Sequence, residues 1–214
     1  YAKRYTFQHN DLTSLEEKLR HVSGNSYILV ESIYSMDGDE APLKAICDLA
    51  DRYHAAVIVD EAHTVGICGP HGKGLVVQEG LTDRVFARTV TFGKALGTHG
   101  AAILGSSSLR AYLINFARSF VYSTAASFSS HLATKMAYQF LIQHDHQQMI
   151  QQRITYFKAL MGDSDGLTNS DSPIQVVLVP GNETARQAAN KLHQAGFDVR
   201  AILSPTVKAG TERL

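Results

Sequence analysis

Short apolar runs alternate with amphipathic segments in the first part of the chain, and this alternation predicts an α/β fold. Residues 26–32 (SYILVES) and 55–60 (AAVIVD) are short apolar runs, which is typical of buried strands. Between them apolar side chains recur at helical spacing from Leu43, and this helix is expected to end near His54. A strand, a helix and a strand within about 35 residues form a βαβ unit, so the sheet is expected to be mainly parallel.

The start of this helix carries its own signal in Asp39 and Pro42. An Asp carboxylate is a strong N-cap because it accepts hydrogen bonds from the unpaired N–H groups of the first turn. Proline is tolerated in that turn because the N–H that it lacks has no partner within the helix. We therefore expect Asp39 to cap the helix and Pro42 to lie in its first turn.

Further strands and helices are predicted along the rest of the chain. Residues 84–92 and 101–106 are apolar runs that predict two more strands. Residues 107–118 and 128–161 are expected to be helical, and a polar break follows them. Beyond the break the pattern predicts a strand, a helix closed by a C-terminal glycine, and a second strand, at residues 174–179, 183–195 with Gly196, and 197–203.

These elements divide into two predicted domains. Residues 1–145 are expected to form part of a large domain, and residues 146–214 part of a smaller α+β domain. The chain opens on YAKRYTF without an initiator methionine and closes on GTERL, where a strand would begin. We therefore expect a fragment that lacks the N-terminal part and the extreme C-terminus of its fold.

The composition narrows the class of protein without naming a function. With 20 Lys and Arg against 20 Asp and Glu, the formal net charge is +0, so the chain carries no basic footprint for nucleic acid. No apolar run approaches the ~18 residues that would span a membrane. Cys47 and Cys68 show no metal-binding spacing, and His144 and His146 lie two apart in a predicted helix, where side chains point apart. We therefore expect a cytoplasmic protein without a metal site.

The second predicted strand runs into VIVDEAHTVG, a stretch that two classes of protein would use differently. In a DEAH-type helicase, Asp60 and Glu61 would hold Mg²⁺ and a nucleotide, and a Walker A motif, G-x-x-x-x-G-K-[ST], would bind the phosphates. The two Gly-Lys pairs of the chain end at Lys73 and Lys94, and neither is followed by Ser or Thr. A helicase would therefore need its Walker A motif upstream of this chain.

The other interpretation of this stretch is a site for a ring-shaped cofactor. Asp60 ends a strand, and ligands of α/β sheets gather at the carboxyl ends of strands. A carboxylate there can keep a pyridinium nitrogen protonated, which makes the ring an electron sink, as pyridoxal phosphate chemistry requires. His63 could present an imidazole N–H to the same cofactor. The local alternative is that Asp60 caps the next turn and that His63 is satisfied by its neighbours.

Lys94 adds a candidate for covalent attachment of a cofactor. It follows the apolar strand at residues 84–92 and is flanked by Gly93 and Gly97. A lysine in a pocket loses its proton more easily, and a neutral amine can form a Schiff base. Thr91, just before the turn, has a hydroxyl that suits a phosphate oxygen. The alternative is an ordinary solvated lysine in a loop.

Five sequence segments carry a resemblance to a known family. In chain order they are ESIYSMDGDEAPL, VDEAHTVGICGPHGKG, TFGKALGTHGAA, FVYSTA and PTVKAGTERL. Together they resemble the α-oxoamine synthases, which are fold-type-I pyridoxal-phosphate enzymes. The resemblance runs from about Phe7 to Leu214. It implies a mainly parallel sheet flanked by helices, with part of a smaller α+β C-terminal domain.

The resemblance also implies the residues of a pyridoxal 5′-phosphate site. Lys94 would hold the cofactor through a Schiff base and act as the general base. Asp60 would pair with the pyridine nitrogen, and His63 would contact the phenolic oxygen and take part in catalysis. The remaining contacts would come from Ser35 beside His63, from Thr91 at the phosphate, and from Ser123 and Thr124 at the phosphate of the neighbouring subunit of a homodimer. Ser123 and Thr124 could instead cap the helix that follows them.

The reaction that the resemblance implies is a decarboxylative condensation. An amino acid would be joined to an acyl-CoA or acyl-carrier-protein thioester, with release of CO₂ and free thiol. A pyridoxal-phosphate aminotransferase, an inactive fragment of a synthase and a DEAH-type helicase fragment stay open as alternatives. The family's ring-stacking histidine has no counterpart in these residues, and its carboxylate-binding arginine would follow Leu214, so Arg213 is not counted as a site residue.

Overall fold

The computed structural model describes residues 2–214, so that Tyr1, the first residue of the predicted large domain, lies outside the described residues. The chain forms two compact units. The first unit comprises the residues up to Ile33 together with Glu40–Met149, and the second comprises Tyr34–Asp39 and Ile150–Leu214. The short segment from Tyr34 therefore belongs to the second unit, although the first unit surrounds it in the sequence. The domain boundary that the sequence places after residue 145 stays a prediction.

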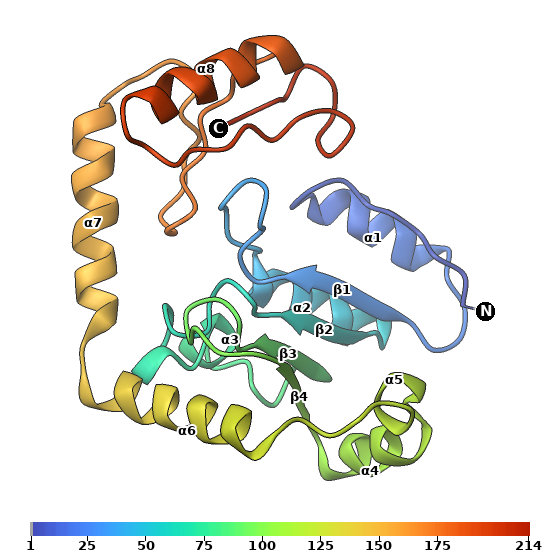
Figure 1. The fold of residues 1–214 in the computed structure, drawn as a ribbon. Helices are drawn as coiled ribbons and strands as arrows, with labels where there is room; N and C mark the ends of the chain where they lie inside the picture. Colours follow the sequence, from blue (N-terminus) through green and yellow to red (C-terminus); the bar gives the residue numbers. More distant parts are fainter. Residues whose placement is uncertain (1) are drawn as a thin grey trace. The chain divides into compact units, whose positions relative to one another are not determined.

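A four-stranded sheet forms the centre of the first unit (Figure 1). Its strands lie in sequence order, with β1 parallel to β2, β2 parallel to β3, and β3 antiparallel to β4. The bounds of the four strands are Tyr27–Glu31, Ala56–Asp60, Ala87–Thr91 and Ala101–Gly105. The prediction of a mainly parallel α/β sheet is therefore confirmed. The last pair is antiparallel because residues 92–100 are too short for a parallel crossover, which needs a dozen residues or more.

One face of this sheet is buried, and α2 (Leu43–Tyr53) packs against β2. Alternate strand residues such as Ile28, Val57 and Val90 are buried there, while the other face is partly exposed. On its sheet side α2 buries apolar side chains at helical spacing, and α1 (Leu12–Arg20) packs beside α2. Apolar burial on one face explains why the period of the sequence predicted β1, β2 and α2 correctly, whereas α1 was not predicted.

The first turn of α2 differs from the prediction. Pro42, not Asp39, is the N-cap residue, and it makes no capping hydrogen bond with a side chain. The expected Asp39 cap is therefore wrong, because the helix begins three residues too late for the Asp39 side chain to reach its first turn. The end of the helix agrees with the prediction, since His54 takes the left-handed conformation (φ 52°) that closes many helices.

The first unit contains further helices between its strands and after its last strand. η1 (Pro70–Gly72) and α3 (Leu75–Gln78) lie between β2 and β3. After β4 come α4 (Ser107–Phe116), α5 (Arg118–Val121) and α6 (Phe128–Gln143). These three helices bury none of their residues.

The single helix predicted over residues 128–161 is two helices. His144 ends α6 with an extended backbone (φ −132°, ψ 136°), and α7 (His146–Met161) begins two residues later. The rings of His144 and His146 lie 5.7 Å apart between centroids and both pack on Phe140. The assumption that the two histidines point apart on one helix is therefore wrong. Packing of their rings on Phe140 accompanies the break.

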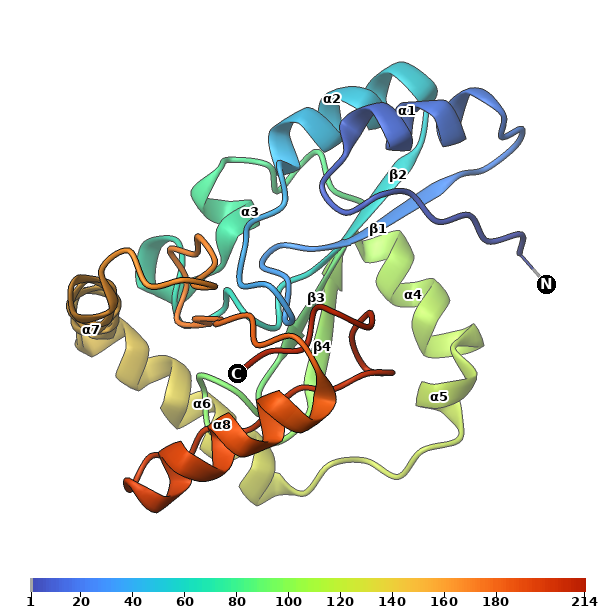
Figure 2. The same ribbon diagram turned by 90° about the horizontal axis from the view of Figure 1, so that it is seen from above.

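The second unit contains α8 (Asn182–Gln194) and extended segments (Figure 2). Gly196 follows the helix with φ 90°, close to its predicted place. The strands predicted at residues 174–179 and 197–203 are not formed in the described part of the chain. Leu178 and Ile202 each make only an isolated antiparallel bridge, both with Arg213. Apolar β-forming residues need a longer partner strand than this one-residue pairing to make a ladder. Among the described residues, no helix is both long and apolar enough to cross a membrane.

Candidate cofactor site

The carboxyl ends of the three parallel strands bring several predicted site residues to one edge of the sheet. Asp60 is the last residue of β2 and Thr91 is the last residue of β3. Asp60 pairs in register with Thr89, and Thr91 lies two residues further along the same strand. Because side chains alternate along a strand, Asp60, Thr89 and Thr91 share the less buried face of the sheet.

Asp60 fixes the turn that follows β2. Its Oδ1 accepts a hydrogen bond from the Ala62 backbone N–H at 2.8 Å. The local interpretation of Asp60 as a cap of the next turn is therefore correct. This bond leaves room for a second role, because an ionised carboxylate has two oxygens and about four acceptor positions.

His63 lies in the turn that Asp60 caps, and it is half-buried. Burial lowers the pKa of this imidazole from its usual 6.5, and the positive charge of Lys94 lowers it further. The negative charges of Glu31 and Asp60 act in the opposite direction but are smaller. His63 is therefore neutral at physiological pH, with Lys94 and Asp60 both near enough to influence its charge.

The loop that carries Lys94 packs directly against the turn that carries His63. Leu96 is buried in a cluster with Val65 and Val90, which lie in the turn and in β3. A Cβ added at Gly66 would lie 2.6 Å from the Ala95 Cβ, so only glycine permits this approach. The Lys94 side chain itself is exposed, so the described chain does not enclose it in a pocket as the sequence suggested.

Thr91 provides the test of whether a cofactor fits this edge. Its Oγ1 is buried from solvent and has no hydrogen-bond partner. A buried hydroxyl without a partner costs free energy, so such groups are uncommon and call for an explanation. A phosphate oxygen would satisfy this donor. The residues of this edge therefore fit an anionic group bound beside β3.

The other three predicted contacts come from other segments of the chain. Ser35 belongs to the segment Tyr34–Asp39 of the second unit. Ser123 and Thr124 are exposed in the segment between α5 and α6, and the Ser123 hydroxyl donates to the Phe120 carbonyl at 3.0 Å. The alternative that they cap the next helix is wrong, because Ser127 is the N-cap of α6 and accepts from the Ser130 N–H. Their predicted roles stay predictions.

The sequence of the chain matches a known family over almost all of its length. The family profile described as aminotransferase class I and II matches residues 2–214. The chain belongs to the aminotransferase class I and II family.

Curated relatives of this aminotransferase-family chain carry the name 8-amino-7-oxononanoate synthase. The protein of Klebsiella pneumoniae (strain 342) is 39% identical, and the match covers 100% of this chain and 56% of that protein. The protein of Emericella nidulans is 38% identical, over 89% of this chain and 49% of its own length. The chain thus spans about half the length of the curated relatives that it matches.

Solved structures agree with the family assignment. A high-resolution structure of SPT with a PLP internal aldimine is 26% identical with a TM-score of 0.88, covering 97% of this chain and 54% of that one. An 8-amino-7-oxononanoate synthase from Francisella tularensis is 25% identical with a TM-score of 0.81, covering 96% and 59%. The resemblance to α-oxoamine synthases and the predicted fold-type-I fold are confirmed.

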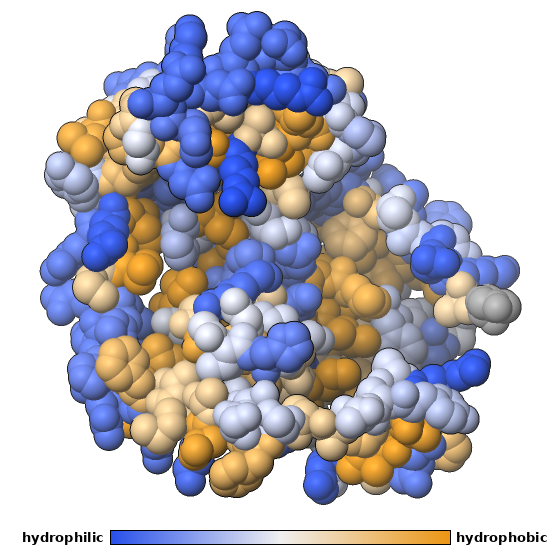
Figure 3. Space-filling model, viewed as in Figure 1, coloured by the Kyte–Doolittle hydropathy of each residue, from blue (hydrophilic) through white to orange (hydrophobic). Residues whose placement is uncertain are grey.

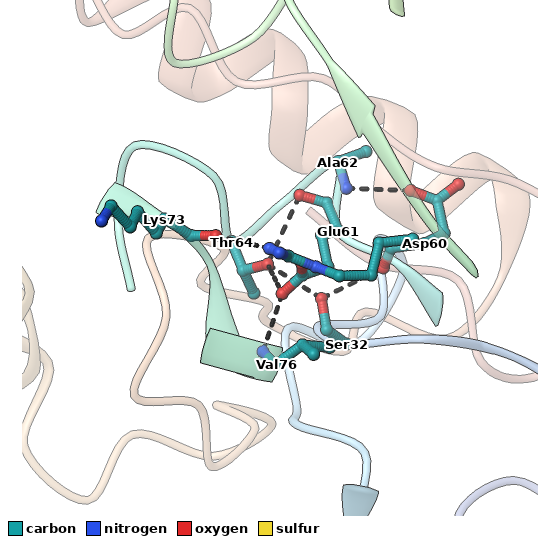
Figure 4. A network of polar contacts seen from close by, with 8 residues as sticks. Ser32, Asp60, Glu61, Ala62, Thr64, Lys73 and Val76 are labelled. Atoms are coloured by element: carbon teal, nitrogen blue, oxygen red, sulfur yellow. Dashed lines mark hydrogen bonds and ion pairs between the residues drawn. The ribbon is translucent and has the colours of Figure 1, made fainter. Parts of the chain in front are cut away.

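Glu61 separates this aminotransferase-family site from the helicase interpretation. The Glu61 side chain is fully buried and forms an ion pair with Arg88, whereas the neighbouring Asp60 side chain points in another direction (Figure 4). Asp60 and Glu61 therefore do not form the acid pair that a helicase needs for Mg²⁺. Family membership and this geometry together exclude the helicase alternative.

The sequence analysis did not identify the residues that pack against the turn and the loop of the site. Arg88, Leu96 and Gly66 contact the turn or the loop of the site, but none was singled out. One signal was available for Arg88, since it is a charged residue inside an otherwise apolar strand. Such a residue is almost never buried without a partner, and Glu61 was the unassigned acid nearby in the motif.

Proposed function

We propose that the protein containing this chain is a pyridoxal 5′-phosphate-dependent acyltransferase of the 8-amino-7-oxononanoate synthase type. It joins an amino acid, L-alanine, to pimeloyl-CoA or the pimeloyl-carrier-protein thioester and releases CO₂ and free thiol, a step in biotin synthesis. The names of the curated relatives support this choice of substrates. The observation that carries the proposal is the buried, unpartnered hydroxyl of Thr91 at the sheet edge that holds Asp60 and His63.

Four residues of the first unit would hold the cofactor. Lys94 would attach it through Nζ, and the Thr91 hydroxyl would donate to its phosphate. Asp60 would face the ring nitrogen, and His63 would donate an N–H to the ring oxygen. Further contacts are proposed on the strength of the family resemblance alone, from Ser35, Ser123 and Thr124.

Each of these residues has a chemical task that its surroundings support. When bound, pyridoxal phosphate supplies a cationic ring that accepts an electron pair from a carbon atom. The Asp60 carboxylate stabilises a proton on the ring nitrogen because opposite charges attract. A neutral His63 has one N–H donor to offer to the ring oxygen. The Lys94 amine would take the proton from the α-carbon of the amino acid.

The helices after β4 support a homodimer with shared sites. α4, α5 and α6 bury none of their residues, yet they carry large apolar side chains that are exposed. Figure 3 shows apolar surface over α4 and α6. Exposed apolar patches of this kind mark interaction surfaces in soluble proteins. A second copy on this surface would bring Ser123 and Thr124, which lie between α5 and α6, to a subunit boundary.

The experiment that tests the cofactor site compares two lysines that each follow a glycine. Lys94→Ala in the complete protein should abolish the absorbance band of lysine-bound pyridoxal phosphate. Lys73→Ala removes another exposed Gly-Lys lysine of the first unit and should keep that band. Retention of the band in Lys94→Ala would refute the assignment of Lys94.

A substrate assay separates the proposed synthase from its relatives. Release of CO₂ and free thiol from L-alanine plus pimeloyl thioester would support the synthase. Transfer of nitrogen without a new carbon–carbon bond would indicate an aminotransferase instead. Turnover of another amino acid and acyl thioester would indicate a 2-amino-3-ketobutyrate CoA ligase or serine palmitoyltransferase activity, and the similarity of the fold to SPT structures makes the latter the first to test. A cytoplasmic location belongs to the same proposal.

A further inference from the structure

A buried ion pair lies beneath the turn that carries Asp60 and His63. The Glu61 side chain is 0% exposed and the Arg88 side chain is 9% exposed. Arg88 Nε donates a hydrogen bond to Glu61 Oε2, and Arg88 Nη2 forms an ion pair with the same oxygen. Neither residue has a task in the proposed reaction.

Glu61 also contacts α3, as Figure 4 shows, and Arg88 contacts the loop that leads into this helix. Glu61 Oε1 accepts from the Val76 N–H at 2.9 Å and from the Thr64 hydroxyl at 3.2 Å. Arg88 Nη2 donates to the Lys73 carbonyl at 2.5 Å. The Glu61 carboxylate thus accepts hydrogen bonds from groups on three different segments, namely the Val76 N–H, the Thr64 hydroxyl and Arg88 Nε.

Thr64 and Ser32 extend this network to the backbone of Asp60. The hydroxyls of Thr64 and Ser32 lie 2.9 Å apart, and Ser32 Oγ donates to the Asp60 carbonyl at 3.0 Å. On the other side of the same peptide, the Glu61 N–H donates to the Thr89 carbonyl at 2.8 Å. The peptide that joins Asp60 to Glu61 is therefore fixed at both of its polar atoms.

The energetics of buried pairs argue that this network does more than stabilise the fold. Removing one partner leaves an uncompensated buried charge, which is strongly destabilising. Replacing both partners by well-packed hydrophobic residues of similar volume is often neutral or even stabilising, because the desolvation of two charges offsets their attraction. A pair that the fold does not need for stability can still be needed for the geometry that it imposes.

We propose that Glu61 and Arg88 form a positioning pair, which holds the Asp60–His63 turn in the geometry that binds pyridoxal phosphate. The proposal rests on the proposed function. The pair acts from the interior, through the Asp60–Glu61 peptide and the Thr64 hydroxyl, and touches no reacting atom. It also explains why adjacent acids in the motif have opposite surroundings, with Asp60 half-buried at the site and Glu61 sealed in the core.

The test uses the complete protein and removes both charges together. The double variant Glu61→Gln, Arg88→Met keeps the side-chain volume and an acceptor for the Val76 N–H, but it removes the donor to the Lys73 carbonyl. We therefore expect its cofactor-free form to fold and to unfold at a modestly lower temperature than the wild type. We expect its dissociation constant for pyridoxal phosphate, from a fluorescence titration, to rise about tenfold or more, the size of effect that outer-shell partners have at metal sites. The pH dependence of the bound cofactor's absorbance should shift as well, which a purely structural role would not cause.

Two further variants complete the test. Thr64→Val keeps both charges but breaks the link from Glu61 to Ser32, and it should weaken cofactor binding in the same direction. The matched control Arg84→Met breaks an exposed pair with Asp48 and Asp51, so it should change the dissociation constant by less than about twofold.

The outcomes separate the two proposals. A double variant that binds pyridoxal phosphate as tightly as the wild type would overturn the positioning role and leave the proposed function intact. Wild-type protein that binds no pyridoxal phosphate would overturn the proposed function and the positioning role with it. Weaker binding in the double variant and in Thr64→Val, beside an unchanged control, supports the positioning role.

Discussion

Thr91 shows how one side chain can be unfavourable for the fold and useful for a ligand. Its buried Oγ1 has no partner within the described chain. Desolvating a hydroxyl without a hydrogen bond costs about 1–3 kcal/mol, so this residue is a poor choice for stability alone. Valine has nearly the same shape and would remove that cost.

We predict that Thr91→Val separates stability from binding. The cofactor-free protein should be as stable as the wild type or more stable, because the unpaired hydroxyl is gone. Its dissociation constant for pyridoxal phosphate should rise about tenfold, since a hydrogen bond to a charged group is lost. Chemical denaturation and a cofactor titration measure the two quantities. Thr89→Val, on the same strand face, is the control, and equal losses of affinity in both variants would contradict the role of Thr91.

His63 gives a prediction about pH. Its pKa in the folded chain lies below 6.5, chiefly through burial, and returns toward 6.5 on unfolding. Below pH 6.5 the unfolded chain therefore binds more protons, and the free energy of unfolding should fall as the pH drops through this window. His63→Gln should flatten this fall below pH 6.5, measured by denaturant titration. An unaltered slope in His63→Gln would contradict the prediction.

At the scale of single residues, the sequence predicted the candidate cofactor-binding residues better than the buried residues that hold them in place. Asp60 and Lys94 could be singled out because each follows an apolar strand, and strand ends are where ligands bind. The partner of Glu61 could not be predicted, because Arg88 lies 27 residues away in the sequence and meets it only through the pairing of β2 with β3. Solvent exposure of Lys94 is likewise a property of the folded loop and not of its glycine neighbours.

At the scale of elements, the contact between the His63 turn and the Lys94 loop depends on Gly66. Its φ of +86° lies in the left-handed region, and an added Cβ would come within 2.6 Å of the Ala95 Cβ. Gly80 has a similar φ of +70°, but an added Cβ there would meet nothing within 4 Å. A substitution at Gly80 therefore introduces backbone strain alone, whereas a substitution at Gly66 introduces both backbone strain and steric overlap.

We predict that Gly66→Ala destabilises the protein more than Gly80→Ala does. Gly80→Ala should cost about 1 kcal/mol, from the left-handed backbone alone. Gly66→Ala should cost about 2–4 kcal/mol, because overlap with the Ala95 side chain adds to that strain. It should also weaken pyridoxal phosphate binding, since Lys94 adjoins the displaced residue. Equal costs for the two variants, from denaturant titrations, would show that the loop moves aside freely.

Helices and strands could be predicted where a local apolar pattern determines them. They could not be predicted reliably where a strand forms only if a partner strand is present. The strands β1 and β2 and the helix α2 follow from apolar period and burial on one face. The break between α6 and α7 has no proline or glycine to announce it, because QHDHQ is compatible with a helix. The apolar runs around Leu178 and Ile202 predicted strands, but a strand also needs a partner, which apolar period cannot supply.

At the scale of the whole molecule, the helices α4 to α6 are the best candidate for a subunit interface. Phe116, Phe120 and Phe128 are 66%, 61% and 81% exposed on them. A specific interface buries about 1,200–2,000 Å² and concentrates its binding energy in a few large side chains, often aromatic. Exposed aromatic side chains on successive helices meet this description.

We predict that Phe128→Asp weakens the proposed homodimer, because it places a charge on the apolar surface. The dimer dissociation constant should rise about tenfold or more, measured by sedimentation velocity of the complete protein. Phe197→Asp is the control, since Phe197 is also exposed (60%) but lies in the second unit. A monomeric wild-type protein, or equal effects of the two variants, would contradict the prediction.

The opposite surroundings of Asp60 and Glu61 have a consequence for how the chain can vary. A replacement at position 61 changes a sealed interior and calls for a compensating change at position 88, so these two positions should co-vary among natural sequences. A replacement at position 60 changes the group that faces the bound ligand and also removes the acceptor of the Ala62 N–H, with no second side chain that could compensate. The two neighbouring acids of one motif should therefore vary differently, position 61 together with position 88 and position 60 without a partner residue.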